Sequence, residues 1–347
     1  VVVRREFLES MVDVAAAGRT VFLSSHQINE VERVADVVAI LRQADGTLAL
    51  RRAGEEGGDV VDWVVEMRRF DQDTLFDRLA RKGELTRALI EDLADRIADF
   101  HHQAEVCNES GAGGRAGTGM IIKSNAECFG QSVSGILDSG KTDTLTRLSL
   151  HALDGVGGLL DRRRDSGRVR LCHGDLHLRN ICMVDGKPTL FDAIEFNQAF
   201  SSIDVLYDLA FVLMDLDQRG LGHLASILFN RYFDNTGEGE ERSDGLRVMS
   251  LFISMRAAIR AHVDIAQAES LSDPEQARRR AGEAAEYLDS ALAALAPRGP
   301  RLIAVGGLSG SGKSRMAREL APNVGGARVV RSDSTRKRLA GVAWNER

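Results

Sequence analysis

The sequence predicts a mixed α/β protein with a mainly helical middle, preceded and followed by shorter α/β segments. Strand-like apolar runs such as "TVFLSS" and "RLIAV" alternate with helical patterns near both ends of the chain. Between them, apolar residues recur at three- and four-residue steps over long stretches, which is the period of an α-helix. Polar stretches rich in Gly or Pro at 51–59 and 296–300 divide the chain into candidate domains at 1–50, 60–297 and 301–347.

The first segment has a compact α/β pattern. We expect an amphipathic helix over 5–18, closed by Gly18, and a buried strand over 20–25. A second helix begins near residue 28 and leads into a strand at 37–41, and "ADGTLAL" (44–50) is typical of a turn followed by a strand.

The middle segment opens with a strand over 60–70 and then becomes helical. A helical pattern over 73–106 is interrupted at Gly83, and the Gly-rich stretch 108–119 is predicted to be a long loop. Further helices are expected over 125–165 and 203–296, with a short strand within 188–196. The last segment predicts a strand at 302–305, a Gly-rich turn, a helix, and another strand within 327–333.

Composition excludes several classes of function. A net charge of −6 gives no attraction toward nucleic acid, and no apolar run approaches the roughly 20 residues of a membrane span. The four cysteines have no spacing suited to zinc. The charged start "VVVRREFLES" does not resemble a secretory signal, so the sequence predicts a cytoplasmic protein.

The most informative stretch is "LCHGDLHLRN" (171–180), followed by "FD" at 191–192. Phosphoryl transfer needs a carboxylate that orients the acceptor hydroxyl and oxygen ligands that hold Mg²⁺ against the phosphates. Asp175, Asn180 and Asp192 supply these groups. The Asp-Gly pair at 185–186 is a strong hairpin signal, and folding the hairpin back would bring Asn180 and Asp192 together.

HGDLHLRN followed by FD resembles the catalytic and metal loops of the aminoglycoside phosphotransferase family, relatives of the protein kinases. The resemblance extends over about 60–297, which would then be the mainly helical C-lobe of a kinase-like fold. It implies that Asp175 is the catalytic base, that Asn180 and Asp192 bind Mg²⁺, and that ATP is the phosphoryl donor. His173 would be structural, Asp208 would tether the loop from the next helix, and His177 would be either a supporting group or solvent-exposed.

A second motif, "GLSGSGKS" (307–314), matches the P-loop pattern between a predicted strand and a predicted helix. Backbone N–H groups of such a loop surround phosphates, while Lys313 would reach the terminal phosphates and Ser314 would ligate Mg²⁺. The glycines concerned are Gly307, Gly310 and Gly312.

The motif with "RSDSTRKRLAG" resembles small-molecule P-loop kinases, which makes Asp333 a candidate near the acceptor. A P-loop module behind a phosphotransferase-like domain resembles a family of two-domain predicted kinases. Because about 47 residues follow the linker, we expect a truncated module that could bind phosphate without turnover of its own.

A third stretch, 1–41, resembles the last part of an ABC transporter ATPase domain, in which His26 would sense the γ-phosphate. An incidental histidine in a small α/β cap is an equal alternative. The P-loop, signature motif and Mg²⁺-binding carboxylate of such an ATPase would all have to lie before this stretch.

A kinase-like fold also needs a phosphate-gripping lysine in an N-terminal sheet, yet the first lysine of this chain is Lys82, beyond the strand at 60–70. The phosphotransferase-like domain is therefore expected to lack most of its N-lobe. Three hypotheses remain: an ATP- and Mg²⁺-dependent phosphotransferase acting on a small-molecule hydroxyl, a nucleotide-binding protein without turnover, and a fragment of a transporter ATPase subunit. The acceptor and the oligomeric state stay open.

Overall fold

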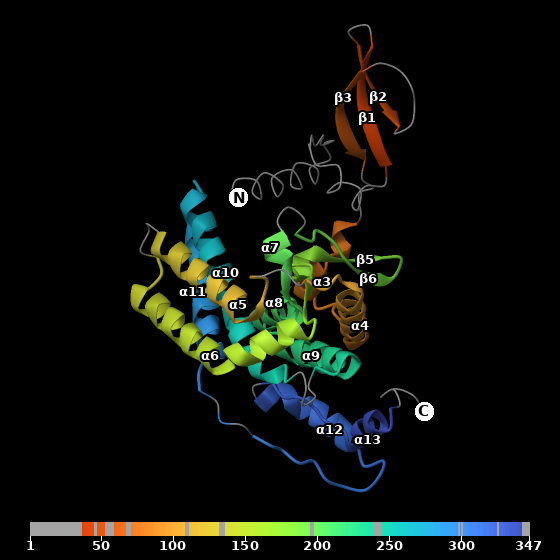
Figure 1. Cartoon of the computed structure of the whole chain (residues 1–347), viewed down its shortest axis with the longest axis vertical. Coiled ribbons are helices and arrows are strands. Elements are labelled where there is room, and N and C mark those ends of the chain that lie inside the picture. Colours follow the sequence, from red (N-terminus) through yellow and green to blue (C-terminus); the bar gives the residue numbers. More distant parts are fainter. Residues whose placement is uncertain are drawn as a thin grey trace. The chain divides into compact units, whose positions relative to one another are not determined.

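The computed structural model forms two compact units that divide between Asp71 and Gln72 (Figure 1). The described residues are 37–44, 47–52, 59–66, 71–107, 111–131, 136–194, 198–238, 244–297, 299, 301–324 and 326–341. The helix expected over 5–18 and the strand expected over 20–25 lie outside them.

The first unit contains a three-stranded antiparallel sheet with the strand order β2-β1-β3. Its strands are β1 (Val37–Ala44), β2 (Thr47–Arg52) and β3 (Asp59–Glu66), so the three strands expected here form. The polar stretch 51–59 connects two strands of one sheet, and the division between units lies at Asp71 instead.

The second unit is dominated by helices, with two short strand pairs, β4–β7 and β5–β6. No described helix has the length and apolar character needed to cross a membrane. Its elements in chain order are η1 (Gln72–Thr74), α3 (Phe76–Lys82), α4 (Arg87–Gln103), α5 (Gly114–Gln131), α6 (Ser139–Asp165), β4 (Val169–Leu171), η2 (Leu178–Asn180), β5 (Ile181–Val184), β6 (Lys187–Leu190), α7 (Gln198–Ser201), β7 (Ser202–Asp204), α8 (Val205–Gln218), α9 (Gly222–Thr236), α10 (Leu246–Ser270), α11 (Pro274–Ala294), α12 (Lys313–Leu320), η3 (Ala321–Val324) and α13 (Ser332–Leu339).

Helix α8 is the central element of this unit. Every residue from Val205 to Leu216 is buried, and α8 packs against both α9 and α10. The Asp204 side chain accepts a hydrogen bond from the Leu206 N–H at 2.9 Å and so caps the helix N-terminus. Because α8 is apolar on all sides, its few buried carboxylates need partners within the protein.

Two local predictions differ from the structure. The Gly-rich loop predicted over 108–119 becomes helix from Gly114, because α5 packs closely on α6 and glycines allow this approach. An added Cβ at Gly114, the first residue of α5, would meet Asp161 Oδ1 of α6 at 2.8 Å. Ser202–Asp204, expected partly in a helix, pairs with β4 as strand β7. The break at Gly83 is confirmed, with φ at 72° after α3.

Neither strand predicted in the C-terminal segment forms. Residues 301–308 and 327–331 have no regular secondary structure, and Leu302 is 97% exposed. A strand requires neighbouring strands for its backbone hydrogen bonds, and the described strands of this unit pair only as β4–β7 and β5–β6. Helix α12 nevertheless begins at Lys313, directly after the Gly-rich turn, and contacts α9.

A buried ion-pair network joins α6 to the start of α8. Arg163, 1% exposed, donates two hydrogen bonds of 2.8 Å to Asp204 and one of 2.5 Å to Glu238, which is fully buried. The two carboxylates keep the pKa of this guanidinium above its ordinary value despite its burial. Arg168 Nη1 lies 3.1 Å from the other oxygen of Glu238, so Asp204 depends on Arg163 for its charge compensation more than Glu238 does.

Replacing Arg163 by Met should lower the free energy of unfolding by about 3–5 kcal/mol, because buried Asp204 loses its counter-ion and buried Glu238 keeps only Arg168. Urea unfolding measures the change. The matched control is Arg162→Met, since Arg162 is the exposed neighbour on the same helix. Equal stability of the two variants would contradict the importance of the network.

Candidate functional site

The loop 173–180 connects β4 to β5 and is held from α8 by one carboxylate. The backbone N–H of His173 donates to Asp208 Oδ2 at 3.1 Å, and that of Gly174 donates to Oδ1 at 2.9 Å. Asp208 is fully buried. A tether between the loop and the following helix, which the sequence suggested for Asp208, is therefore present.

Three neighbouring cationic or hydrogen-bonding groups support the Asp208 carboxylate. His101 Nε2 donates to Asp208 Oδ2 at 3.1 Å, and its Nδ1 is hydrogen-bonded to the Tyr232 hydroxyl at 2.8 Å. Burial alone would raise the pKa of Asp208. The hydrogen bond and charge of His101, with the charges of His173 and Arg256, instead hold the pKa below its ordinary value.

Arg256 of α10 binds the same loop through a backbone carbonyl group. Its Nη1 donates to the Gly174 carbonyl at 2.9 Å, and its Nε donates to the Tyr207 carbonyl at 3.0 Å. The guanidinium carbon lies 3.9 Å from the centroid of the Tyr207 ring, within the range of a cation–π contact. Gly174 is thus fixed through both its N–H and its C=O.

Asp175 follows directly, and its side chain is 15% exposed. Asn180 Nδ2 donates to the Asp175 backbone carbonyl at 3.0 Å and to its Oδ2 at 3.1 Å. His177 Nε2 lies 3.5 Å from the same Oδ2. Gly174 has φ at 81°, and a Cβ there would meet Ile194 at 3.0 Å, so the turn before Asp175 requires glycine.

The segment after β6 lies against this loop. His173 Nε2 donates to the Phe191 carbonyl at 2.8 Å, and the Ile194 N–H donates to the His173 carbonyl at the same distance. The Phe191 N–H donates to the Asn180 carbonyl at 3.1 Å. The predicted hairpin, with left-handed Asp185 and Gly186 at its turn, therefore places Asn180 opposite Phe191, the residue before Asp192.

The side chains of Asn180 and Asp192 carry the kinds of oxygen atom that could bind a hard divalent cation. Asn180 uses its NH₂ group for both bonds to Asp175, so its carbonyl oxygen remains available among the described contacts. Asp192 is exposed and has φ at 60°, a left-handed conformation that is uncommon outside glycine. Carboxylate and amide oxygens are the ligands that Mg²⁺ prefers.

The second half of the loop is fixed by another buried carboxylate of α8. The Leu178 N–H donates to Asp215 Oδ2 at 2.9 Å, and Arg219 Nε donates to its Oδ1 at 2.8 Å. Burial would raise the pKa of Asp215, but the charges of Arg219 and His177 and these hydrogen bonds lower it. Both halves of the loop therefore depend on α8.

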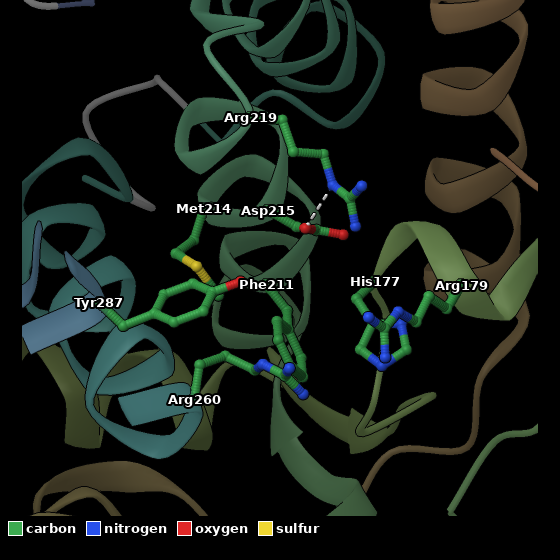
Figure 2. Close-up of a pocket in the computed structure, with 8 residues that line it drawn as sticks. All are labelled: His177, Arg179, Phe211, Met214, Asp215, Arg219, Arg260 and Tyr287. Atoms are coloured by element: carbon green, nitrogen blue, oxygen red, sulfur yellow. Dashed lines mark hydrogen bonds and ion pairs between the residues drawn. The ribbon is translucent and has the colours of Figure 1, made fainter. Parts of the chain in front are cut away.

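A pocket opens beside the loop, between α8, α10 and α11 (Figure 2). His177 connects it to Asp175, since its ring lines the pocket and stacks edge-to-face on Phe211 at 5.2 Å between centroids. His177 is 7% exposed and is thus a buried neighbour of Asp175. The lining residues are His177, Arg179, Phe211, Met214, Asp215, Arg219, Arg260 and Tyr287.

The Gly-rich turn before α12 lies elsewhere. In Figure 1, α12 and α13 lie at the opposite end of the helical unit from the β5–β6 hairpin. Gly307, Gly310 and Gly312 all have positive φ, and Lys313 Nζ donates to the Leu308 carbonyl across the turn. A Gly-rich turn followed by a helix is present at this motif, but the strand expected before them is not.

The remaining predicted residues are not brought to the loop 173–180. Ser314 is exposed in the first turn of α12. Asp333 is exposed in α13, where its Oδ2 lies 3.5 Å from Lys337 Nζ. His26 lies outside the described residues.

Sequence reasoning missed four residues of the site, namely His101, Arg179, Arg256 and Arg260. A signal for two of them existed, because Arg256 and Arg260 lie four residues apart in the otherwise apolar "SLFISMRAAIRAHV". A charged residue within an apolar helical stretch indicates that its side chain is paired with another polar or charged group inside the protein. The sequence alone does not say that the partner is the loop at 173–180.

Comparison with known proteins shows the family of this chain. The model of the phosphotransferase enzyme family matches residues 12–246, about two thirds of the chain. The chain belongs to this family. The match includes most of segment 1–50, whose resemblance to a transporter ATPase finds no support in these comparisons, and it ends before the P-loop motif.

Three mycobacterial proteins are similar to this phosphotransferase family member. They are the uncharacterized proteins Rv2004c and MT2060 of Mycobacterium tuberculosis and Mb2027c of Mycobacterium bovis, each 28% identical over 307 residues. The alignments cover 85% of this chain and 58% of each relative. The chain therefore spans less than two thirds of the length of these relatives.

Similarity to solved structures is weak. A choline kinase from Cryptosporidium parvum is 11% identical with a TM-score of 0.43, covering 68% of this chain and 72% of that one. An aminoglycoside 2'-phosphotransferase-IIIa is 15% identical with a TM-score of 0.42, covering 77% and 79%. At these values the likeness supports no functional argument.

Replacing Asp208 by Asn should free the loop, because an amide cannot accept both backbone N–H groups with the strength of a carboxylate. Hydrogen exchange of the His173 and Gly174 amides should then accelerate about tenfold or more, relative to core amides of α8. Asp217→Asn is the control, since Asp217 is exposed on the same helix. Unchanged exchange in Asp208→Asn would show that the loop is held by other contacts.

Proposed function

We propose that this chain transfers the γ-phosphoryl group of ATP to a hydroxyl group of a small molecule, with Asp175 as the general base. The observation that carries the proposal is the position of the Asp175 carboxylate. It is oriented by Asn180, fixed in a loop that α8 holds at both ends, and connected through His177 to a pocket. The family match supports phosphotransfer as the class of reaction.

In the proposed reaction, a hydroxyl oxygen of the acceptor forms a bond to the γ-phosphorus while the bond from that phosphorus to the β,γ-bridging oxygen breaks. The hydroxyl proton passes to Asp175, and ADP leaves. Such transfers depend mostly on positioning and charge stabilisation, so a rigidly held loop is the main contribution that the protein makes. His177, beside the carboxylate, helps to fix its orientation.

Asn180 and Asp192 would hold a divalent cation. When bound, such a cation neutralises negative charge on the phosphates of the nucleotide. The hairpin β5–β6 keeps these two residues together, and the Asn180 bonds to Asp175 link the metal ligands to the base.

The Gly-rich turn before α12 is a second candidate phosphate site. Backbone N–H groups at the start of a helix favour anions, and Lys313 lies beside the turn. We assign it no catalytic role, because no carboxylate that could accept a proton from an acceptor is recorded in contact with it among the described residues. Nucleotide binding without turnover at this turn is the alternative to the proposal.

Replacing Asp175 by Asn should reduce acceptor-dependent ADP formation by at least about a hundredfold, because the amide cannot take the hydroxyl proton. A coupled ADP assay with Mg²⁺ measures the rate. Asp185→Asn is the matched control, since Asp185 is an exposed turn residue whose left-handed backbone Asn also tolerates. Equal rates in Asp175→Asn and wild type would contradict the proposal, provided that circular dichroism shows that both proteins are folded.

A further inference from the structure

The pocket beside Asp175 is unusually cationic for the site of a small-molecule acceptor. Three guanidinium groups line it, from Arg179, Arg219 and Arg260, against one carboxylate, Asp215. They come from η2, the end of α8, and α10, so three separate elements direct positive charge to one place (Figure 2). Asp215 is already engaged by Arg219 and by the Leu178 N–H, as described above.

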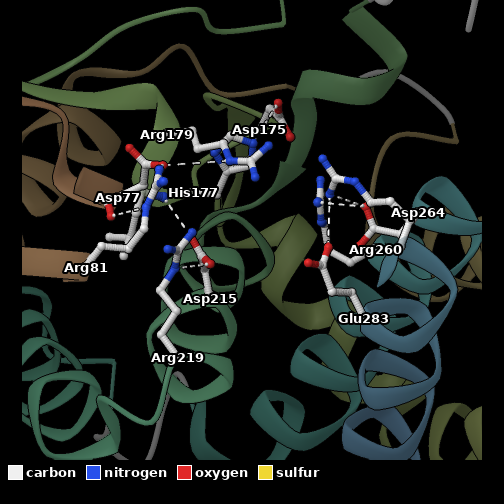
Figure 3. Close-up of polar contacts among 12 residues, drawn as sticks. Asp77, Arg81, Asp175, His177, Arg179, Asp215, Arg219, Arg260, Asp264 and Glu283 are labelled. Atoms are coloured by element: carbon white, nitrogen blue, oxygen red, sulfur yellow. Dashed lines mark hydrogen bonds and ion pairs between the residues drawn. The ribbon is translucent and has the colours of Figure 1, made fainter. Parts of the chain in front are cut away.

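Arg179 is the least compensated of these cations. Among the described residues its nearest carboxylate is Asp77, whose Oδ2 lies 4.0 Å from Arg179 Nε, and Asp77 already pairs with Arg81 (Figure 3). No described residue accepts a hydrogen bond from its guanidinium. Its side chain is 51% exposed overall, and partial desolvation, together with the charges of Arg260 and Arg280, lowers the pKa of Arg179.

Arg260 and Arg280 share a single buried carboxylate. Arg260 Nη2 lies 3.1 Å from Asp264 Oδ1, and Arg280 Nη1 lies 3.5 Å from the same oxygen (Figure 3). Arg280 also contacts Glu283 at 3.1 Å. The remaining oxygen of Asp264 is buried without a hydrogen bond to a described residue. The contact with Asp264 holds the Arg260 side chain in position, and Arg260 still lines the pocket.

We infer that the acceptor carries an oxyanion, a carboxylate or a phosphate ester, in addition to the hydroxyl that receives the phosphoryl group. This inference rests on the proposed function. The guanidinium fork binds both kinds of oxyanion with two parallel hydrogen bonds, and the apolar walls formed by Phe211 and Met214 strengthen such bonds.

A cationic acceptor fits this pocket poorly. An ammonium group would have to lie among three guanidinium groups and would be repelled by them. The single lining carboxylate, Asp215, cannot offset this repulsion because it is bound to Arg219. With the oxyanion held between Arg179 and Arg260, the hydroxyl of a short hydroxy acid or phosphate ester can extend toward His177 and Asp175.

Calorimetric titration with four matched small molecules tests the inference. Glycerate and glycerol 3-phosphate are the anionic probes, glycerol is the neutral probe, and 3-amino-1,2-propanediol is the cationic probe. At least one anion should bind about tenfold or more tightly than the neutral and cationic probes, and which one binds distinguishes a carboxylate from a phosphate ester. No binding of either anion, or equal binding of the cation, overturns the inference.

Arg179→Gln and Arg260→Gln should each weaken anion binding about tenfold, the loss expected for a charge-assisted hydrogen bond. Arg87→Gln is the control, because Arg87 is a half-exposed arginine on α4 that pairs with Glu91. Anion binding that is the same in all three variants overturns the inference.

The experiment separates the inference from the proposed function. Asp175→Asn should retain anion binding while losing transfer. If the anions bind in an arginine-dependent way but no probe is phosphorylated, the proposed phosphotransferase function is contradicted and the anion site is supported. Transfer to the cationic probe at the rate seen with the anions upholds the phosphotransferase and overturns the anion site.

Discussion

The buried carboxylate of Asp208 is the constraint on which the site depends. It accepts the N–H groups of two successive loop residues, and it can do so only as an anion. His101 and Arg256 keep it charged in an otherwise apolar helix, and each of them also reaches another part of the protein. Because an uncompensated buried charge is costly, these groups form one unit, and the loop takes its position from α8.

From this anchor, the geometry of the candidate site follows in short steps. Gly174 permits the turn that presents Asp175, and the β5–β6 register brings Asn180 to Phe191 and so to Asp192. Asp215 fixes the far end of the loop and contributes to the wall of the pocket. Asn180 contacts Asp175 directly, and the loop that carries both residues is held at its two ends by carboxylates of α8.

The sequence could predict features that depend on local chemistry. The Asp-Gly turn of the hairpin, the break at Gly83 and the order of Asp175, Asn180 and Asp192 all follow from residue types and spacing. Features that depend on tertiary packing could not be predicted. Strand β7 exists because β4 lies beside it, and the Arg179 and Arg260 side chains, 81 positions apart, meet only in the folded protein.

In the C-terminal segment, the sequence instead predicted an element that does not form. An apolar run before a Gly-rich turn looks the same whether or not neighbouring strands exist, so the pattern at 302–305 predicted a strand that does not form.

The account is tested most directly by measuring which of the two candidate sites, the loop 173–180 with Asp192 or the Gly-rich turn before α12, binds nucleotide. Calorimetric binding of Mg-ATP should be lost in Asp192→Asn and retained in Lys313→Ala. Binding retained in Asp192→Asn and lost in Lys313→Ala would place the nucleotide at the Gly-rich turn and contradict the account.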